Sequence, residues 1–350
     1  MKKILTLMLV VIMAFSMFAC GGGGTEEPAG DQTGDQAAQP DKKVLGIILI
    51  DLTNQFFIDM VEGGNQAAED YGVEVIWKSS DGSIDKQISL MENFIEQGVD
   101  CILVNPIDSA SLEGVIKQAS EAGIPTVAMA GQVDVENSYT TVYNDYENTE
   151  IIGHILANLV GKEGKVALLY GNTGNLVSDL RQGGFEEAMK AYPNIKLIEQ
   201  PMNWDPATGL KAAQDIIAAN PDLKGLHCVS DAVTLAAYQA VKDAGLEDQI
   251  TVTSYDGNPD SCIAVENGEF VLTLLTGSKR AGYWNVQVGA MLANGEKPDE
   301  QIINMATHFV MTDEIKATVE AMNLPYDFDI IGPQEAIGMA DLYDDFEPEK

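Results

Sequence analysis

Residues 44–77 read VLGIILIDLTNQFFIDMVEGGNQAAEDYGVEVIW, and this stretch decides the fold class. It begins with the apolar run 44–50, continues with a segment of helical period at 57–71, and passes Gly72 into a second apolar run at 73–77. A short, continuous apolar run predicts a strand that is covered on both faces, and a glycine just past the last periodic residue is typical of a helix end. The stretch therefore predicts a strand, a helix and a second strand of a parallel sheet.

The same alternation continues along most of the chain. The predicted strands are 44–50, 73–77, 101–105, 126–129, 165–170, 196–200, 225–229, 251–255 and 270–275. The predicted helices are 57–71, 86–97, 111–122, 148–160, 177–191, 207–219, 232–244, 260–267 and 279–294, followed by 313–322. So many units exceed one sheet of usual size, so we expect an α/β protein with two doubly wound sheets and a first break near Asn144.

The first nineteen residues have the build of a secretory signal peptide. Lys2 and Lys3 precede the apolar run 4–18, and the small residue Ala19 stands just before Cys20. The apolar run is shorter than the roughly 20 residues that a spanning helix needs. We therefore expect residues 1–19 to direct export and to be removed.

The stretch MFAC at 17–20 resembles a bacterial lipobox, in which Cys20 becomes the lipid-modified first residue of the mature protein. An ordinary cleaved signal with a chance cysteine is the alternative. Residues 21–43 carry almost no apolar side chain and cannot bury enough surface to offset chain entropy. We expect residues 20–43 to be a flexible tether that holds the protein at the outer face of the cell membrane or in the periplasm.

The charge of the chain excludes one class of partner. The formal net charge is −34, and the only arginines are Arg181 and Arg280. Nucleic-acid phosphates need lysine and arginine to neutralise them, so nucleic acid is not an expected partner. A well-solvated acidic surface explains most of the negative charge.

The cysteines and histidines show no metal-binding spacing, so we expect neither a metal nor a cofactor. Besides Cys20 the chain has Cys101, Cys228 and Cys262. Buried free thiols are the default for such residues. An exported chain could also join Cys228 to Cys262, and the sequence leaves that pairing open.

Polar and aromatic residues follow most of the predicted strands, at the sheet edge where parallel α/β proteins bind ligands. These residues are Asp51, Thr53, Asn54, Phe56, Phe57, Asn105, Asp108, Gly171, Asn172, Asn203, Trp204, Ser230, Asp231, Asp256, Gly257 and Thr276. Carboxylates and amides bind hydroxyl groups, and ring faces cover the C–H edges of a sugar. We expect Asp231 to cap the helix that starts at Ala232. We expect Asp256 to contact ligand, because Gly257 permits close backbone approach.

Three stretches occur in the order in which a known family has them. They are DLTNQFF at 51–57, GVDCILVNPID at 98–108 and YDGNPD at 255–260. Over about residues 44–311 the chain resembles the ribose-binding-protein family of periplasmic solute receptors. The resemblance implies a type I periplasmic binding protein fold, in which two Rossmann-like lobes are joined by three hinge crossings and close on a ligand.

The resemblance also implies where the lobes divide. The crossings fall near Asn144, Thr276 and Thr307. The N-terminal lobe is then 44–144 plus 277–306, and the C-terminal lobe is 145–276 plus 307–350 including an acidic tail, whose last ten or so residues we expect to be loose.

The positions that match the family's ligand contacts come from both lobes. They are Asn54, Phe56, Phe57, Arg181, Trp204 and Asp256, together with Ser230 and Thr276, which stand where the family often has asparagine and glutamine. The forked guanidinium of Arg181 suits hydroxyl oxygens and also suits pairing with Asp256. The Asp-Arg pair that commonly follows the fourth strand is replaced by Ala130 and Gly131. These differences argue against ordinary ribose and leave another sugar, a polyol, a furanone or a nucleoside-like compound as the ligand.

By this resemblance the chain is a monomeric solute-binding lipoprotein that delivers its ligand to the permease and ATPase of an ABC importer. A receptor for a membrane sensor or a chemotaxis system is the alternative partner assignment. An enzyme is disfavoured, since the G-x-S-x-G, Walker and H-E-x-x-H motifs are missing from the sequence. A sugar-responsive transcription regulator would need a DNA-binding head where this chain has an export signal.

Overall fold

The computed structural model describes residues 42–344 and 346. The predicted signal peptide, Cys20 and nearly all of the predicted tether lie outside the described residues. Within this part of the chain no helix is long and apolar enough to cross a membrane.

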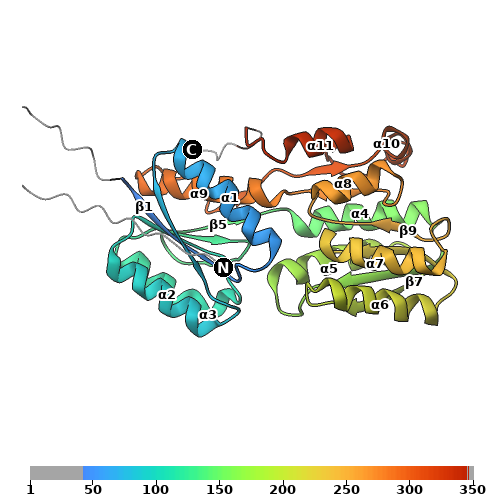
Figure 1. Cartoon of the computed structure of the whole chain (residues 1–350), viewed down its shortest axis with the longest axis horizontal. Coiled ribbons are helices and arrows are strands. Elements are labelled where there is room, and N and C mark those ends of the chain that lie inside the picture. The colour runs from blue at the N-terminus through green and yellow to red at the C-terminus, as the bar shows by residue number, and fades with distance from the viewer. Residues whose placement is uncertain (1–41, 345, 347–350) are drawn as a thin grey trace, which may run out of the picture. The chain divides into compact units, whose positions relative to one another are not determined.

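The first lobe is built on a six-stranded parallel sheet in the order β11-β5-β4-β3-β1-β2. Its strands are β1 (Val44–Leu49), β2 (Glu74–Ser79), β3 (Cys101–Val104), β4 (Thr126–Met129), β5 (Ser138–Val142) and β11 (Ile302–Asn304). The helices α2 (Ile84–Gln97) and α3 (Ser109–Glu121) lie side by side on one face, and α1 (Gln55–Asp70) and α9 (Ser278–Ala293) lie on the other (Figure 1).

Alternate residues of β1 enter two different cores. Ile47 belongs to the core beneath α1 and α9, whereas Ile48 belongs to the core beneath α2 and α3. This double burial explains the continuous apolar run that predicted the strand. Helices α1 and α9 cross closely because both are glycine-lined there: a Cβ atom at Gly63 would lie 2.0 Å from the Lys279 carbonyl oxygen, and one at Gly282 would lie 2.0 Å from that of Met60.

The second lobe contains a parallel sheet in the order β7-β6-β8-β9. Its strands are β6 (Gly164–Tyr170), β7 (Ile195–Pro201), β8 (Leu223–Cys228) and β9 (Thr251–Thr253). Two isolated bridges, Thr253 to Leu272 and Asp256 to Leu275, continue it toward the small sheet β10 (Thr273–Leu275), β12 (His308–Val310) and β13 (Ile330–Ile331).

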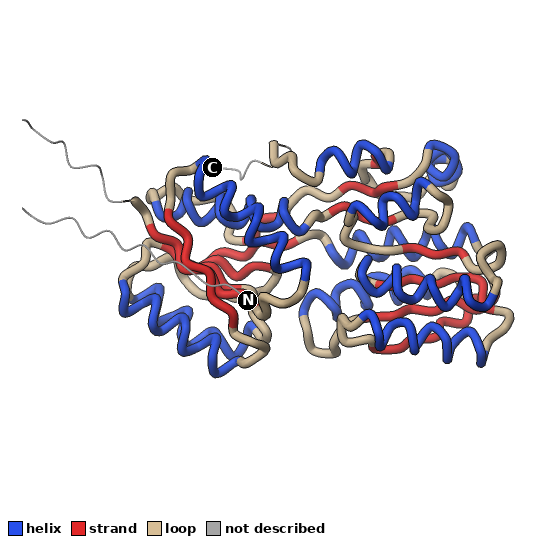
Figure 2. Tube along the Cα trace, in the orientation of Figure 1, coloured by secondary structure: helices blue, strands red, loops and turns tan. Residues whose placement is uncertain are grey.

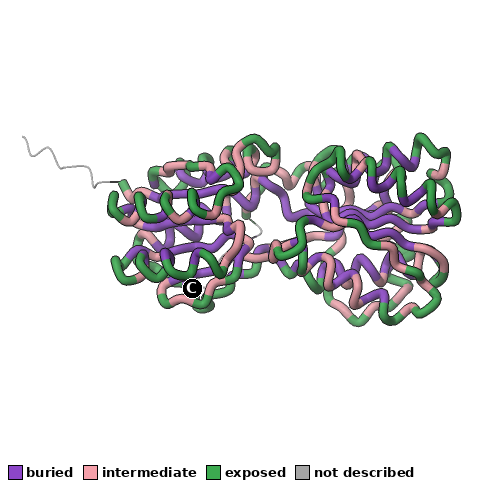
Figure 3. The backbone as a smooth tube through the Cα atoms, turned by 90° about the horizontal axis from the view of Figure 1, so that it is seen from below, coloured by how far each residue is buried: buried purple, intermediate pink, exposed green. Residues whose placement is uncertain are grey.

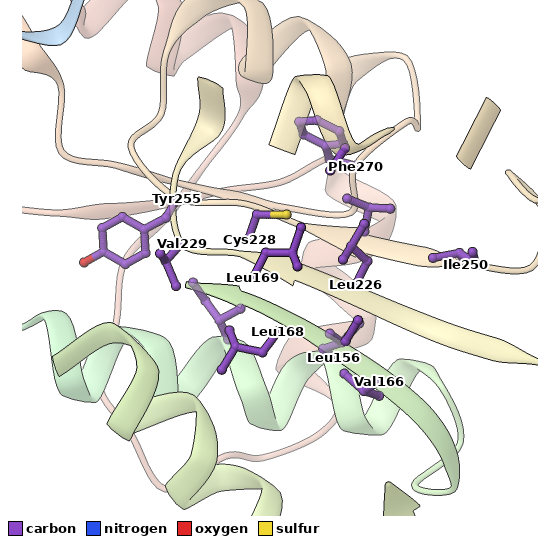
Figure 4. Close-up of a cluster of buried hydrophobic side chains, with 14 of the residues drawn as sticks. Leu156, Val166, Leu168, Leu169, Leu226, Cys228, Val229, Ile250, Tyr255 and Phe270 are labelled. Atoms are coloured by element: carbon purple, nitrogen blue, oxygen red, sulfur yellow. The ribbon is translucent and has the colours of Figure 1, made fainter. Parts of the chain in front are cut away.

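Helices pack in pairs on this lobe as well, α4 (Asp145–Leu159) with α5 (Leu176–Lys190) and α6 (Pro206–Ala219) with α7 (Asp231–Ala244) (Figure 2). Helix α8 (Pro259–Glu266) packs against α11 (Pro333–Met339), and α10 (Asp313–Glu320) follows β12. The central strands of both sheets are buried, the edge strands β2 and β7 are partly exposed, and the helices alternate between buried and exposed residues (Figure 3). The core combines aliphatic side chains of β6 and β8 with side chains from the flanking helices, and Tyr255 lies next to Val229 at its end (Figure 4).

The chain passes between the two lobes where β5 leads into α4, where β10 leads into α9, and where β11 leads into β12. The tail then returns to the first lobe. The Tyr343 ring stacks on the Tyr283 ring of α9 with centroids 4.0 Å apart, and Trp284 Nε1 donates to the Tyr343 carbonyl oxygen at 3.0 Å. Phe346 lies 5.0 Å from the Trp284 ring. The tail was expected to stay with the second lobe and to end loosely, yet these described residues pack into the core of the first lobe.

The predicted α/β class with two doubly wound sheets is confirmed. The predicted strands and helices agree with the observed bounds to within three residues. Strands β5, β11, β12 and β13 and helix α11 were not among the predicted elements, because segments of five, three, three, two and seven residues are too short to show a period.

Candidate functional site

Arg181 of α5 lies at the centre of a buried polar cluster in the second lobe. It is 6% exposed. Its Nε donates to Asp145 Oδ1 at 2.8 Å, and its Nη1 donates to Asp256 Oδ1 at 2.9 Å and to the Val229 carbonyl oxygen at 2.8 Å. The guanidinium carbon lies 3.7 Å from the centroid of the Tyr255 ring. We call Arg181, Asp145, Tyr255 and Asp256 the Arg181 cluster. The ion pair between Arg181 and Asp256 is one that the forked guanidinium suits.

The elements of the fold explain how these residues meet. Asp145 is the first residue of α4, immediately after the chain enters the second lobe, and Tyr255 and Asp256 follow β9. Tyr255 donates its hydroxyl to Asp145 Oδ1 at 2.7 Å. The cluster therefore forms at the carboxyl end of the parallel sheet, where ligands of α/β proteins bind.

The charges of the cluster stabilise one another. Burial alone would lower the pKa of Arg181, but the charges of Asp145 and Asp256 outweigh burial and raise it above its ordinary value. Burial raises the pKa of Asp256, although Arg181 and a hydrogen bond from the Ser230 side chain act in the opposite direction. Arg181 is thus permanently charged, and its two carboxylate partners are held against it.

Asp231 does not cap its helix, so that expectation is wrong. Helix α7 starts at Asp231 itself, with Ser230 as its N-cap residue. Asp231 is fully buried; it accepts hydrogen bonds from the Thr273 hydroxyl at 2.8 Å, from the Asn258 amide at 2.7 Å and from the Ser254 hydroxyl. Burial, and then the nearby charge of Asp256, raises the pKa of Asp231 to about 7. The two buried carboxyl groups therefore influence each other's protonation.

The backbone at Asp256 is strained. Its φ is +116°, a value that non-glycine residues rarely adopt, and Gly257 follows at +72°. A Cβ atom at Gly257 would lie 2.3 Å from Leu275 Cα, so the expected close approach at this glycine is made to a neighbouring strand. The Asp256 carbonyl oxygen accepts the Thr276 amide at 3.1 Å and the Thr276 hydroxyl at 3.3 Å. Thr276, which is fully buried, thereby helps to hold the strained residue in place.

Trp204 forms a separate part of the candidate site, beyond the end of β7. It has a left-handed backbone with φ of +58°, as does Asn203 before it. The ring lies on Gly171 at the end of β6, where a Cβ atom would come within 2.3 Å of Trp204 Cε2. The ring is partly exposed. Its position therefore depends on the absence of a side chain at residue 171.

The predicted first-lobe residues lie together at the start of α1. Asn54 is the N-cap, and its side-chain oxygen accepts the Phe56 amide at 2.9 Å. The Phe56 and Phe57 rings meet edge to face with centroids 5.6 Å apart, and both are partly buried. Asn54 therefore caps helix α1, while Phe56 and Phe57 are both partly exposed.

The eight predicted ligand residues form three groups. Hydrogen bonds join Arg181, Ser230, Asp256 and Thr276, Trp204 packs on Gly171, and Asn54, Phe56 and Phe57 form the third group. Among the described residues, no hydrogen bond, ion pair or ring contact joins the first-lobe group to the other two. A hollow of about 600 Å³ between β7 and α6 contains none of the eight residues.

Sequence reasoning did not identify Asp145 and Tyr255 as members of the site. Tyr255 stands beside Asp256 in a quoted motif, and Asp145 follows the first predicted break between lobes. An aspartate at a break has no diagnostic spacing to an arginine 36 residues away, so only the folded structure joins them.

The described residues contain no group of histidine, cysteine and carboxylate side chains that could hold a metal ion. Cys101, Cys228 and Cys262 are free and buried. Burial raises the pKa of the Cys228 thiol to about 12, which leaves it protonated and unreactive.

Comparisons with known proteins agree with this architecture. The family model described as a periplasmic binding protein domain matches residues 45–297. The ribose import binding protein RbsB of Salmonella typhimurium is 27% identical over 257 residues, which cover 73% of this chain and 86% of the relative. The D-allose-binding periplasmic protein of Escherichia coli K12 is 28% identical over 285 residues, which cover 78% of this chain and 91% of the relative.

A solved structure is also similar. It is a periplasmic solute-binding protein of an ABC transporter from Actinobacillus succinogenes 130z, which carries bound D-allose. It superposes with a TM-score of 0.73 at 26% identity and covers 79% of this chain and 100% of its own.

Proposed function

This chain belongs to the periplasmic binding protein family, whose sugar-binding members are not enzymes, and we propose that it captures a sugar or sugar-like compound for an ABC importer. The proposed delivery to a permease and its ATPase is supported by the names of its relatives, which include import binding proteins. The proposal for this chain is supported mainly by one feature of the Arg181 cluster.

That feature is a guanidinium in which one nitrogen, Nη2, makes no hydrogen bond within the described residues. Nε and Nη1 donate to Asp145, Asp256 and Val229, whereas Nη2 has no hydrogen-bond partner among the described residues. The described part of the chain has several fully buried polar atoms that lack a partner, but Nη2 is not one of them. Nη2 therefore retains contact with solvent. A positioned donor with two N–H groups at the carboxyl end of a sheet suits the hydroxyl or ring oxygens of a sugar.

Aromatic surface complements this donor. Trp204 is held in place beside the second sheet, and Phe56 and Phe57 keep exposed ring surface at the end of β1. Sugars present C–H groups on one side and hydroxyl groups around the rim, so ring faces and polar groups together recognise them. We propose that the ligand lies between these two sets of residues and draws the lobes together when it binds.

The ligand differs from ribose in this proposal. At the end of β4, Ala130 has a left-handed backbone, and a Cβ atom at Gly131 would lie 2.5 Å from the Pro106 ring, so this edge offers no charged side chain. A hexose, a pentose isomer or a polyol that needs fewer contacts from the first lobe fits this uncharged edge better than ribose does. A nucleoside is the competing ligand class.

We also propose that the protein is exported and anchored through a lipid on Cys20. The support is the sequence of the first twenty residues and the family to which the chain belongs. Residues 20–43 would then connect the lipid to the binding lobes.

The proposed ligand class is tested by thermal unfolding with a panel of pentoses, hexoses, polyols, nucleosides and amino acids. A ligand that binds only the folded protein stabilises it by about 2.7 kcal/mol at a hundredfold excess over Kd. We expect a clear rise in Tm with at least one sugar or polyol. A rise with amino acids and none with sugars or polyols would contradict the proposed class. Native mass spectrometry of the purified protein identifies any ligand that is retained.

A further inference from the structure

Asp145 is the cluster member whose role the proposed function leaves open. It is 3% exposed, and its Oδ1 accepts both Arg181 Nε at 2.8 Å and the Tyr255 hydroxyl at 2.7 Å. Asn148, one turn further along α4, donates to the Tyr255 hydroxyl at 3.4 Å. Asp145 is thus fixed from two sides with its charge against the guanidinium.

The cluster contains more carboxyl groups than cations. Arg181 carries the positive charge, and Asp145 and Asp256 both pair with it. Asp231 lies behind Asp256, and its amide donates to Asp256 Oδ2 at 3.4 Å. In the described residues, every lysine ion pair joins a carboxylate outside this group. Even with a proton shared between Asp231 and Asp256, the cluster has no uncompensated positive charge.

This balance of charge decides which ligand groups can bind to Nη2. A hydroxyl oxygen can take a hydrogen bond from Nη2 without bringing a charge. A carboxylate or phosphate would bring a negative charge close to Asp145 and Asp256 in a poorly solvated place, where like charges repel strongly. Across the site, Ala130 and Gly131 supply no compensating cation.

We propose that Asp145 is a specificity-determining residue that neutralises Arg181 and so makes the site select neutral polyhydroxy ligands over anionic ones. The inference rests on the proposed function, in which Arg181 faces the ligand. In this inference the charge of Asp145 causes the site to reject sugar acids and sugar phosphates. Specificity often depends on such repulsion of the wrong ligand.

Asp145→Asn is the informative substitution. The amide oxygen keeps an acceptor for Arg181 and Tyr255, while the negative charge is removed. Asp145→Glu restores the charge on a longer side chain. Asp215→Asn makes the same change of charge at an exposed position of α6 in the same lobe, and serves as the matched control. Circular dichroism melting establishes that each variant is folded before binding is measured.

Titration calorimetry compares a neutral probe with anionic partners of the same skeleton, D-glucose with D-glucose 6-phosphate and with D-glucuronate. We expect the wild type to prefer the neutral probe at least tenfold. Asp145→Asn should reduce that preference at least tenfold, Asp145→Glu should restore most of it, and Asp215→Asn should leave it unchanged. If Asp145 has a purely structural role, Asp145→Asn will weaken the binding of both probes equally and leave the ratio of their affinities unchanged, and this result would overturn the proposal. A wild type that prefers the anionic probe would also overturn it.

A second measurement does not depend on which sugar binds. Sodium sulfate and sodium chloride at equal ionic strength are compared for their effect on Tm. We expect a sulfate-specific rise in Asp145→Asn that is absent from the wild type and from Asp215→Asn. An equal response in all three proteins would contradict the neutralising role. If no sugar or polyol binds the wild type, the proposed function fails, and the sulfate comparison still decides the role of Asp145.

Discussion

Arg181 and Asp256, 75 residues apart in sequence, are joined by a hydrogen bond of 2.9 Å inside the second lobe. Both residues are almost fully buried. Removing one partner of a buried ion pair leaves the other uncompensated and typically costs about 3–5 kcal/mol of stability. Arg181 therefore supports the fold as well as the proposed site, and its substitutions must be chosen so that the two roles can be separated.

Gly171→Ala should move the Trp204 ring, because the new methyl group would lie 2.3 Å from ring atoms. We expect ligand affinity to fall by about tenfold, equivalent to about 1.4 kcal/mol, with a changed tryptophan emission spectrum. Fluorescence and titration calorimetry measure these effects. Gly114→Ala is the control, because no atom lies within 4 Å of its added Cβ. Unchanged emission and affinity in Gly171→Ala would show that Trp204 does not depend on residue 171.

Tyr343→Ala should destabilise the protein by about 1–3 kcal/mol, because it removes a stacked ring pair from the surface of α9. Urea unfolding at equilibrium measures this loss. Tyr146→Ala removes a tyrosine that is 40% exposed, and it should cost less. If the loss in Tyr343→Ala is no larger than in this control, the tail does not contribute to the stability of the first lobe.

Asp231 should make stability depend on pH. Its pKa in the folded protein is about 7, above the ordinary value of 3.8, so the folded state binds the proton more tightly than the unfolded state. The contribution of Asp231 to the stability of the folded protein is fully present below about pH 4 and declines as the pH rises toward 7. Asp231→Asn removes this titration. The free energy of unfolding of Asp231→Asn relative to wild type should therefore rise between pH 4 and pH 7.

His227 makes the relative measurement for Asp231 necessary. Burial lowers the pKa of His227 to about 3, so this residue stabilises the folded state above pH 6.5 and destabilises it as the pH falls. The two residues oppose each other in the same range of pH. Comparison of Asp231→Asn with wild type cancels the contribution of His227, and a difference that stays constant from pH 4 to pH 7 would contradict the raised pKa.

Cys20→Ser should release the protein from the membrane fraction, because only the cysteine thiol can receive the lipid and two or more acyl chains are needed for stable attachment. Cell fractionation followed by immunoblotting measures the distribution. Cys262→Ser changes a buried thiol and should leave the protein in the membrane fraction. A wild-type protein found free in the extracellular fraction would disprove the anchor.

The sequence predicted most of the fold because its strands and helices are long enough to show their periods. The resemblance to a family singled out Arg181 and Asp256, and the ion pair between them is one that the forked guanidinium was noted to suit. The sequence did not predict that Asp145 would hold the other side of the guanidinium, since that contact depends on how α4 and α5 pack. The capping role expected of Asp231 failed because Ser230 takes the N-cap position and Asp231 turns into the core. The return of the tail depends on aromatic partners on α9, which no local pattern reveals.

The central claim is that Arg181 donates to the ligand through Nη2, and titration calorimetry of Arg181→Lys with the identified ligand tests it most directly. Lysine keeps the positive charge among the carboxylates but loses the planar fork. A hydrogen bond to a charged group contributes about 1.5–3 kcal/mol, so we predict that binding weakens by roughly tenfold to a hundredfold while the variant stays folded. Binding by a folded Arg181→Lys variant within twofold of wild type would contradict the claim.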